Sequence, residues 1–385
     1  GYRRRMTRSD SYTNGPLTRL RYPSMLLAAT SLLVGMAAGL ARAGIDIPRL
    51  PAEAPLRHGP LMVSGFLGTL IAVERAVGLG RPWAWMGPLA AAAGAAVLLG
   101  GGSLAAASAA FAIAAAILVA VFAEVLRLRP EASAAVLLLG AAAWLGSALR
   151  GMGGAGVVEL VPWWVAFLAL TIAGERLELG RFRAPGRRAV LLFAPAALLV
   201  LGGAALSAAD LGAGVRLQGA GLVGLALWLA RYDVARRTVR AAGQARYIAA
   251  CLLSGFFWLA VAGAAFAGWA GSFAAGLRYD AMLHAFFLGY VMAMVFGHAL
   301  IILPGVMRLR VPYRRGFYAQ LVLLDAGLAV RIAGDVAGQA ALREAGAVLN
   351  VAAVLLFLAA TAASALAEVG KTALRRGSAA PTPSG

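Results

Sequence analysis

The chain of 385 residues is 61% hydrophobic and only 13% charged, with a formal net charge of +19. Soluble domains are about 45–50% apolar and about 25% charged, so this composition excludes an ordinary soluble domain and predicts an all-α, polytopic membrane protein. The single cysteine, Cys251, excludes an intrachain disulfide and a zinc or iron–sulfur site built from cysteines.

Apolar windows of about 20 residues mark helices that can span a bilayer. Twelve such windows follow one another, and the connections between them are too short for a soluble domain. They cover residues 23–42, 59–79, 83–101, 104–126, 131–150, 156–177, 188–208, 213–233, 246–269, 279–304, 317–338 and 343–369. We expect one transmembrane domain over 23–370, between a basic N-terminal segment, 1–22, and a disordered tail, 371–385.

The lysines and arginines predict how the helices are oriented. With these boundaries, 27 of the 35 Lys and Arg residues fall on the side of the N-terminus and seven on the opposite side. Positive residues accumulate in cytoplasmic loops, so both termini are expected to be cytoplasmic. The net charge is then explained by loops that face anionic lipid. We therefore expect the lipid bilayer, and not a nucleic acid, as a partner.

A weak internal repeat connects the second and sixth predicted helices. Glu74-Arg75 and Glu175-Arg176 lie at the same end of these helices, 101 residues apart. Units of four helices keep one orientation, so the chain would consist of three parallel repeats. The tenth helix would be the next equivalent, but it lacks such a pair. The three-fold repeat is therefore one of two interpretations of the sequence. Both pairs are predicted to be structural.

The chain has three histidines, and all of them lie in or beside predicted helices. His284 and His298 share the tenth helix, about 21 Å apart along its axis and roughly 40° from alignment. His58 begins the second helix, just before Pro60. The predicted topology places His58 and His284 near the outer surface and His298 near the inner one. A haem held by His58 and His284 is one interpretation, and polar residues at the membrane interface are the other.

Two further side chains accompany these histidines. Met62 lies one turn after His58 on the same face, where it can pack on a cofactor or on lipid. Asp280 precedes His284 by four residues and can hold the ring nitrogen that a ligating imidazole leaves free.

Charged residues within the eleventh predicted helix need partners, because an unpaired charge in a membrane is costly. Arg331 can pair with Asp335, one turn further on, or with a haem propionate. Asp325 lies deeper and on another face, either as a proton-handling carboxylate or as a hydrogen-bond partner between helices.

His298 has no second histidine at its depth, so it cannot share in a second bis-histidine haem. It could be a five-coordinate ligand, could pair with a methionine, or could hydrogen-bond to Glu74 or Glu175. The hydrogen bond is the preferred interpretation.

Residues His58 to Phe66 read H-x-x-x-M-x-x-G-F. This resembles the signature on the second helix of the NnrS family, twelve-helix bacterial membrane proteins linked to nitric oxide metabolism. The tenth helix and the stretch LVLLDAGLAVRIAG are similar to that family's later histidine helix and to the arginine-bearing helix after it. The resemblance implies haem and copper, and an architecture like that of haem–copper oxidase catalytic subunits, where histidines on helices 2 and 10 ligate the low-spin haem. It also implies the bacterial inner membrane.

The chain departs from the family pattern in ways that affect the metal prediction. The usual signature has a second histidine and an acidic residue where this chain has Gly59, Pro60 and Leu61, and the sixth and seventh helices contain no histidine. Copper therefore lacks ligands, and only haem is expected. The function that follows is haem binding linked to nitric oxide, another small ligand or an electron donor. A secondary transporter or channel with a His, Asp and Arg pathway, and a non-catalytic membrane subunit, remain as alternatives.

Overall fold

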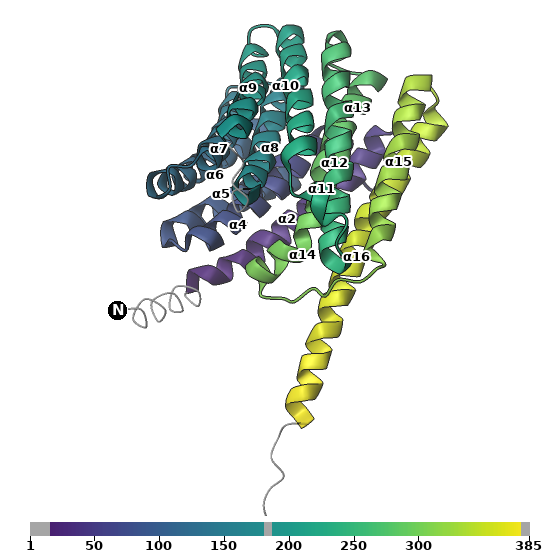
Figure 1. The fold of residues 1–385 in the computed structure, drawn as a ribbon. Helices are drawn as coiled ribbons and strands as arrows, with labels where there is room; N and C mark the ends of the chain where they lie inside the picture. Colours follow the sequence, from purple (N-terminus) through teal and green to yellow (C-terminus); the bar gives the residue numbers. More distant parts are fainter. Residues whose placement is uncertain (1–15, 181–186, 379–385) are drawn as a thin grey trace, which may run out of the picture.

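The computed structural model describes residues 16–180 and 187–378, which form helices and no strand. Twelve helical spans within these residues are long and apolar enough to cross a membrane. The all-α fold with twelve spans is therefore confirmed, and the chain is a multi-pass membrane protein. Figure 1 shows the spans gathered into one bundle.

The described residues form the following elements in chain order. These are η1 (Pro16–Leu20), α2 (Arg21–Arg42), α3 (Ala54–Pro60), η2 (Leu61–Gly68), α4 (Thr69–Leu79), η3 (Pro82–Trp85), α5 (Met86–Leu99), α6 (Leu104–Leu128), α7 (Ala132–Met152), α8 (Val157–Gly180), α9 (Arg187–Leu206), α10 (Leu211–Tyr232), α11 (Ala235–Thr238), α12 (Gly243–Gly268), η5 (Ala270–Ser272), α13 (Leu277–His284), η6 (Ala285–Met292), α14 (Ala293–Met307), α15 (Phe317–Ala337) and α16 (Ala340–Ser378). The second span combines α3, η2 and α4, and the tenth combines α13, η6 and α14.

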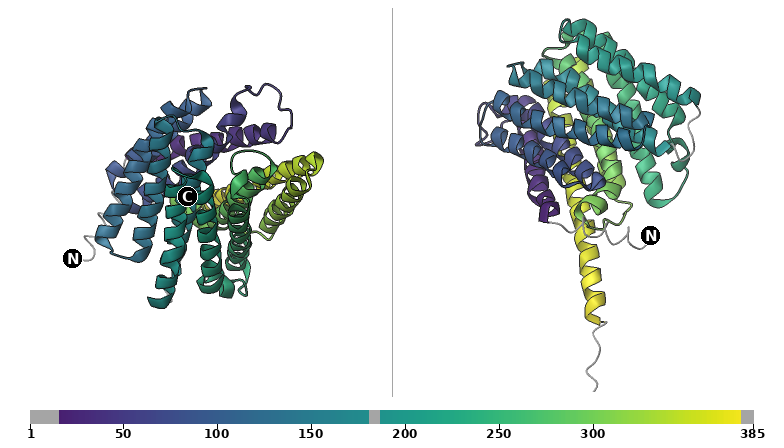
Figure 2. Two further views of the ribbon diagram at one scale, coloured as in Figure 1. Left: turned by 90° about the horizontal axis from the view of Figure 1, so that it is seen from above. Right: turned by 90° about the vertical axis from the view of Figure 1, so that its left-hand side faces the viewer.

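The ends of the chain differ from the prediction. Residues 371–378 were expected to be disordered, but α16 continues as a helix to Ser378. It projects beyond the rest of the bundle in Figure 1 and in the right-hand view of Figure 2. Most of the predicted basic segment, residues 1–15, lies outside the described residues, as do 379–385.

Neighbouring spans in the sequence pack against each other, as in the pairs α6 with α7, α9 with α10 and α15 with α16. The second and tenth spans are far apart in sequence and still meet, because α4 contacts α14. The sixth span, α8, contacts both α3 and η6. These contacts place the two histidine-bearing spans next to each other within the bundle.

Both histidine-bearing spans contain a widened helical stretch directly after the histidine. The π-helix η2 begins three residues after His58, and the π-helix η6 begins one residue after His284. Such segments are rare and are frequent at functional sites. The two spans therefore share a local irregularity at the position of their histidines.

Candidate functional site

The imidazoles of His58 and His284 lie together although they come from different spans. Their ring centroids are 6.2 Å apart, and the ring planes differ by 26°. A metal bound by both rings at about 2 Å per nitrogen needs the centroids roughly 6 Å apart, since each nitrogen lies about 1 Å from its ring centre. The structure thus brings together the two histidines that the sequence assigned to one site, with a centroid separation that matches the one expected for a shared metal.

Each ring is oriented by a backbone carbonyl. Nδ1 of His58 lies 2.7 Å from the carbonyl oxygen of Gly35 in α2, and Nδ1 of His284 lies 2.9 Å from that of Asp280. Because a carbonyl only accepts, each Nδ1 carries the proton and each Nε2 keeps its lone pair. Within residues 16–180 and 187–378, no hydrogen bond to either Nε2 is found. This arrangement is typical of metal-ligating histidines.

Two glycines of α2 make room for the second span. A Cβ atom at Gly39 would lie 2.8 Å from Cε1 of His58, and one at Gly35 would lie 2.8 Å from Sδ of Met62. The two glycines form a G-x-x-x-G pattern, which is typical of close helix packing in membranes. The sequence interpretation missed their role, although the pattern can be read at residues 35–39.

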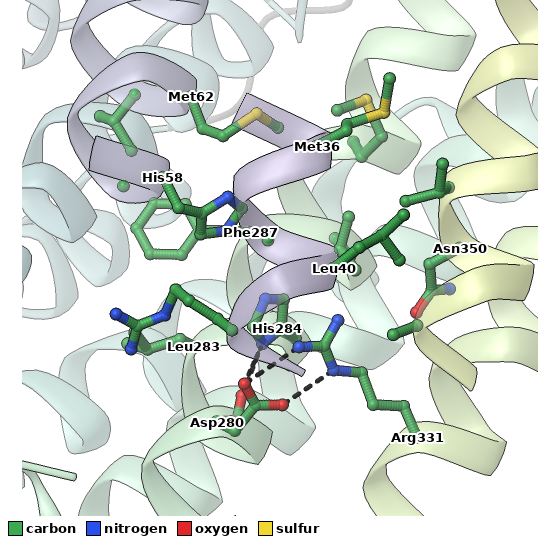
Figure 3. A pocket seen from close by; sticks show the side chains of 18 of the residues that line it. Met36, Leu40, His58, Met62, Asp280, Leu283, His284, Phe287, Arg331 and Asn350 are labelled. Atoms are coloured by element: carbon green, nitrogen blue, oxygen red, sulfur yellow. Dashed lines mark hydrogen bonds and ion pairs between the residues drawn. The ribbon is translucent and has the colours of Figure 1, made fainter. Parts of the chain in front are cut away.

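Arg331 pairs with Asp280 and not with Asp335. Its Nε and Nη2 donate to the two carboxylate oxygens of Asp280 at 2.8 and 3.0 Å (Figure 3). Asp335 is buried one turn further on, and no ion pair between it and Arg331 occurs in the described part of the chain. The prediction of Asp335 as the structural partner is therefore wrong, because a carboxylate on a neighbouring helix engages the guanidinium in bidentate geometry.

Asp280 also connects this ion pair to the histidines. Its carboxylate lies 3.3 Å from Nδ1 of His284, in addition to the carbonyl contact. The predicted role of Asp280 as the residue that orients His284 is supported, with the backbone carbonyl making the shorter contact. One carboxylate therefore fixes both His284 and Arg331.

A cavity of about 130 Å³, which we call the histidine cavity, lies among these side chains. Its wall is mostly apolar and includes Met36, Met62, Trp164 and Phe287 besides the two histidines. Arg42, at the end of α2, also lines the cavity and makes no ion pair within the described residues. The sequence interpretation did not assign Arg42 to a site.

The two imidazole donors fit a haem iron. The histidine cavity, however, is too small for a haem unless side chains move. Ligand pockets are typically about 300–1,000 Å³, which exceeds the volume of the histidine cavity. Met36 and Met62 form part of its wall, and methionine is unbranched and has three rotatable bonds. Within the described residues, no group of three or more His, Cys, Asp or Glu side chains could hold a bare metal ion. Two imidazoles alone would suit a metal that is already held within a cofactor such as haem.

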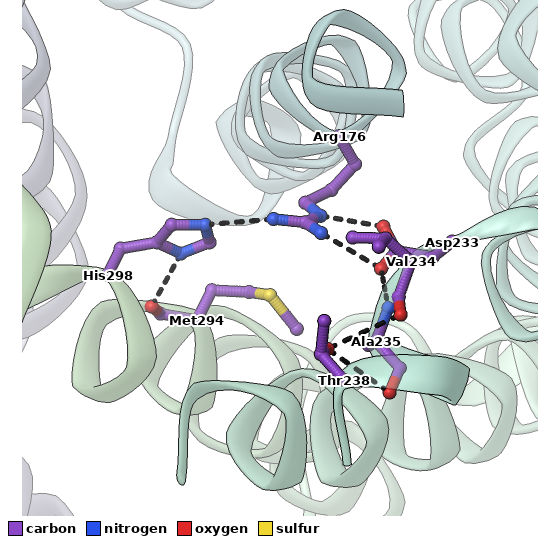
Figure 4. A network of polar contacts seen from close by, with 7 residues as sticks. All are labelled: Arg176, Asp233, Val234, Ala235, Thr238, Met294 and His298. Carbon is purple, nitrogen blue, oxygen red and sulfur yellow. Dashed lines mark hydrogen bonds and ion pairs between the residues drawn. The ribbon is translucent and has the colours of Figure 1, made fainter. Parts of the chain in front are cut away.

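His298 lies toward the other end of the tenth span and takes part in a different network (Figure 4). Its Nδ1 donates to the carbonyl of Met294 at 2.8 Å, and its Nε2 lies 3.5 Å from Nη1 of Arg176. Arg176 donates to both oxygens of Asp233 at 2.7 and 2.9 Å. The preferred prediction, a hydrogen bond from His298 to a glutamate, is wrong because a carbonyl of its own helix takes the ring N–H.

The two Glu-Arg pairs connect different spans. Arg75 of α4 forms an ion pair with Glu175 of α8 and lies 3.4 Å from Glu74. Arg176 joins α8 to Asp233, the residue that follows α10. These contacts support the structural role predicted for both pairs.

Asp325 lies outside the histidine cavity. Its carboxylate accepts hydrogen bonds from Ser254 Oγ at 2.8 Å and from Trp258 Nε1 at 3.0 Å, and both donors lie on α12. Of the two roles considered for Asp325, the structure has the hydrogen bond between helices.

The comparison with known families covers nearly the whole bundle. A family model described as "Domain of unknown function (DUF8744)" matches residues 21–366. No curated protein matches the chain in sequence. The matched range contains all three histidines, Arg42 and Arg331. Because it exceeds half of the chain, this protein belongs to the DUF8744 family.

Proposed function

We propose that this chain is a membrane haem protein in which His58 and His284 are the two axial ligands of one haem. The observation that carries the proposal is the 6.2 Å separation of their ring centroids. The proposal is supported by the backbone carbonyls that hold Nδ1 of each ring and so direct each Nε2 lone pair away from them.

The residues around the rings have separate tasks. The carbonyl of Gly35 and the residue Asp280 fix the orientation of the two imidazoles. Arg42 presents a guanidinium group that would suit a carboxylate such as a propionate, whereas two nitrogens of Arg331 already donate to Asp280. Most of the wall around the rings is apolar. A bound haem supplies one-electron chemistry.

Two imidazoles that both hold one haem would favour electron transfer over the binding of a gas. Both imidazoles would be used to hold the group, so neither His58 nor His284 would be left to assist the binding of nitric oxide or oxygen. The resemblance to the NnrS family then suggests that the chain delivers electrons within a nitric oxide or related redox metabolism. The bacterial inner membrane, with both termini in the cytoplasm, belongs to the same proposal and rests on the charge distribution.

Transport of protons or ions is a second candidate. Buried ion pairs lie toward both ends of the bundle, Arg331 with Asp280 and Arg176 with Asp233. Leu67 lies between these regions and lines the histidine cavity as well as a second cavity beside Glu74 and Glu175. Ionisable groups within membrane spans often mark such pathways.

An absorbance spectrum of the purified protein separates the two candidates. The haem proposal predicts a Soret band that sharpens and shifts when dithionite is added, together with about one haem per chain. A protein that stays colourless after expression with ample haem supply contradicts it. Proton uptake by liposomes that contain this colourless protein would then support transport.

A further inference from the structure

Asp335 of α15 is a buried carboxyl group that no arginine pairs with. The residue is 3% exposed, and both of its carboxyl oxygens are buried. No donor in the described part of the chain forms a hydrogen bond to either oxygen. Arg331, one turn earlier on the same helix, donates to Asp280 instead. An isolated ionised carboxylate is so costly to bury that such a group is neutralised by a proton.

Close packing of α15 against α16 leaves little space around Asp335. A Cβ atom at Gly334 would overlap the backbone nitrogen of Arg343, and one at Gly346 would overlap that of Arg331. The two helices therefore approach each other backbone to backbone on either side of the carboxyl group. Hydration cannot stabilise a charge on Asp335, because its oxygens are buried in this packing.

The charged groups that act most strongly on Asp335 lie on three helices. They are Asp280 of α13, Arg331 of α15 itself and Arg343 of α16. The other elements that pack on α15, which are α12, η6 and α14, contribute none of these groups. Within the described residues, no ion pair joins Arg343 to Asp335. Nη2 of Arg343 donates to the carbonyl of Ala43 instead.

The carboxyl groups of Asp335 and Asp280 are close enough for a hydrogen bond. Two ionised carboxylates offer only acceptors, so a hydrogen bond between them requires that one of the two groups carries a proton. Asp280 accepts from Nε and Nη2 of Arg331 at 2.8 and 3.0 Å, and this bidentate contact favours its ionised form. Of the two carboxyl groups, Asp335 is the one that lacks another neutralising partner.

We propose that Asp335 is a proton-binding site, a carboxylic acid that donates its proton to the carboxylate of Asp280. Asp335 does not line the histidine cavity, so it holds this proton whether or not a haem is bound. Ionisable groups within membrane spans often mark proton pathways. The transport candidate thereby gains a defined proton-binding group near one end of the eleventh span.

Infrared spectroscopy of the full-length protein in lipid nanodiscs at neutral pH tests this proposal. A carboxylic acid has a C=O stretching band that is separate from the bands of carboxylates and of the peptide backbone. We expect the comparison of wild type with Asp335→Asn to show the loss of one such band. Asp210→Asn is the control and should keep the band, because Asp210 is an exposed helix cap that accepts from the backbone N–H of Ala213.

Thermal melting of the same samples gives a second readout. Asp335→Asn replaces the O–H group by an amide N–H that can also donate to Asp280, so its melting temperature should stay close to that of the wild type. Asp335→Leu has no donor and should melt at a lower temperature, because it leaves Asp280 without this hydrogen bond. An ionised Asp335 held by Arg343 would give equal losses in both variants, since each would leave Arg343 without its partner.

The outcomes are distinct. Loss of the band in Asp335→Asn, with a preserved melting temperature and an intact band in Asp210→Asn, supports the proposal. A folded Asp335→Asn that keeps every carboxylic acid band of the wild type overturns it, as do equal losses of stability in Asp335→Asn and Asp335→Leu. If Asp335→Asn does not fold, Asp335→Glu is used, and an unshifted band in that variant overturns the proposal. A colourless protein that still has the Asp335 band contradicts the haem proposal alone.

Discussion

Arg331 of α15 holds Asp280 of α13 in a bidentate ion pair, although 51 residues separate them in the sequence. The side chain of Arg331 is only 7% exposed, so its charge depends on this partner. The same carboxylate lies 3.3 Å from Nδ1 of His284. The ion pair therefore links the eleventh span to the histidine that we assign to the haem.

Replacing Asp280 by Asn should destabilise the protein strongly. Removing one partner of a buried pair typically costs about 3–5 kcal/mol, because the other charge stays buried without compensation. Thermal melting in detergent measures the loss. Asp335→Asn is the control, since Asp335 is buried in α15, the helix of Arg331, but does not pair with Arg331. A larger loss of stability in Asp335→Asn than in Asp280→Asn would contradict the assignment.

A side chain at Gly39 should displace the imidazole of His58. A Cβ atom there would lie 2.8 Å from Cε1, which is closer than two carbon atoms can pack. We expect Gly39→Ala to lower the haem content while the chain still folds. Gly202→Ala in α9 is the control, because a Cβ atom at Gly202 has no neighbour within 4 Å. An unchanged haem content in folded Gly39→Ala would show that the position of the His58 ring does not depend on a glycine at residue 39.

Loss of the Glu175 carboxylate should lower the stability of the fold more than it changes the absorbance spectrum of the haem. Glu175→Gln removes the ion pair that Arg75 makes between α4 and α8. Both side chains are partly exposed, at 17% and 20%, so a loss of about 1 kcal/mol is expected once solvent screening is considered. Expression level and melting temperature measure it. A normal melting temperature combined with a lost Soret band would contradict a structural role.

The sequence was sufficient to predict the fold and the histidine pair. The chain length and composition required many spans, and hydropathy placed twelve of them. His58 and His284 could be paired because the topology placed both at one depth and because histidine is rare in this chain. The proposed three-fold repeat stays a prediction.

Contacts between spans were harder to predict, because they depend on which helix faces pack together. Asp335, at i+4, was a reasonable partner for Arg331 within one helix, yet packing placed Asp280 closer. His298 was expected to contact a glutamate at its depth, but it lies beside Arg176. Depth along the membrane normal can be estimated from sequence, whereas rotation about each helix axis is set by packing.

The measurement that tests the central claim most directly is the low-spin haem signal in three histidine variants. Electron paramagnetic resonance of the oxidised protein reports whether two imidazoles bind the iron, and haem content per chain is measured on the same samples. We predict that His58→Ala and His284→Ala each lose the low-spin signal, because each removes one ring of the pair whose centroids lie 6.2 Å apart. His298→Ala should keep the signal, because His298 belongs to the Arg176 network and does not line the histidine cavity. A low-spin haem that survives in both His58→Ala and His284→Ala, or one that is lost only in His298→Ala, would contradict the account.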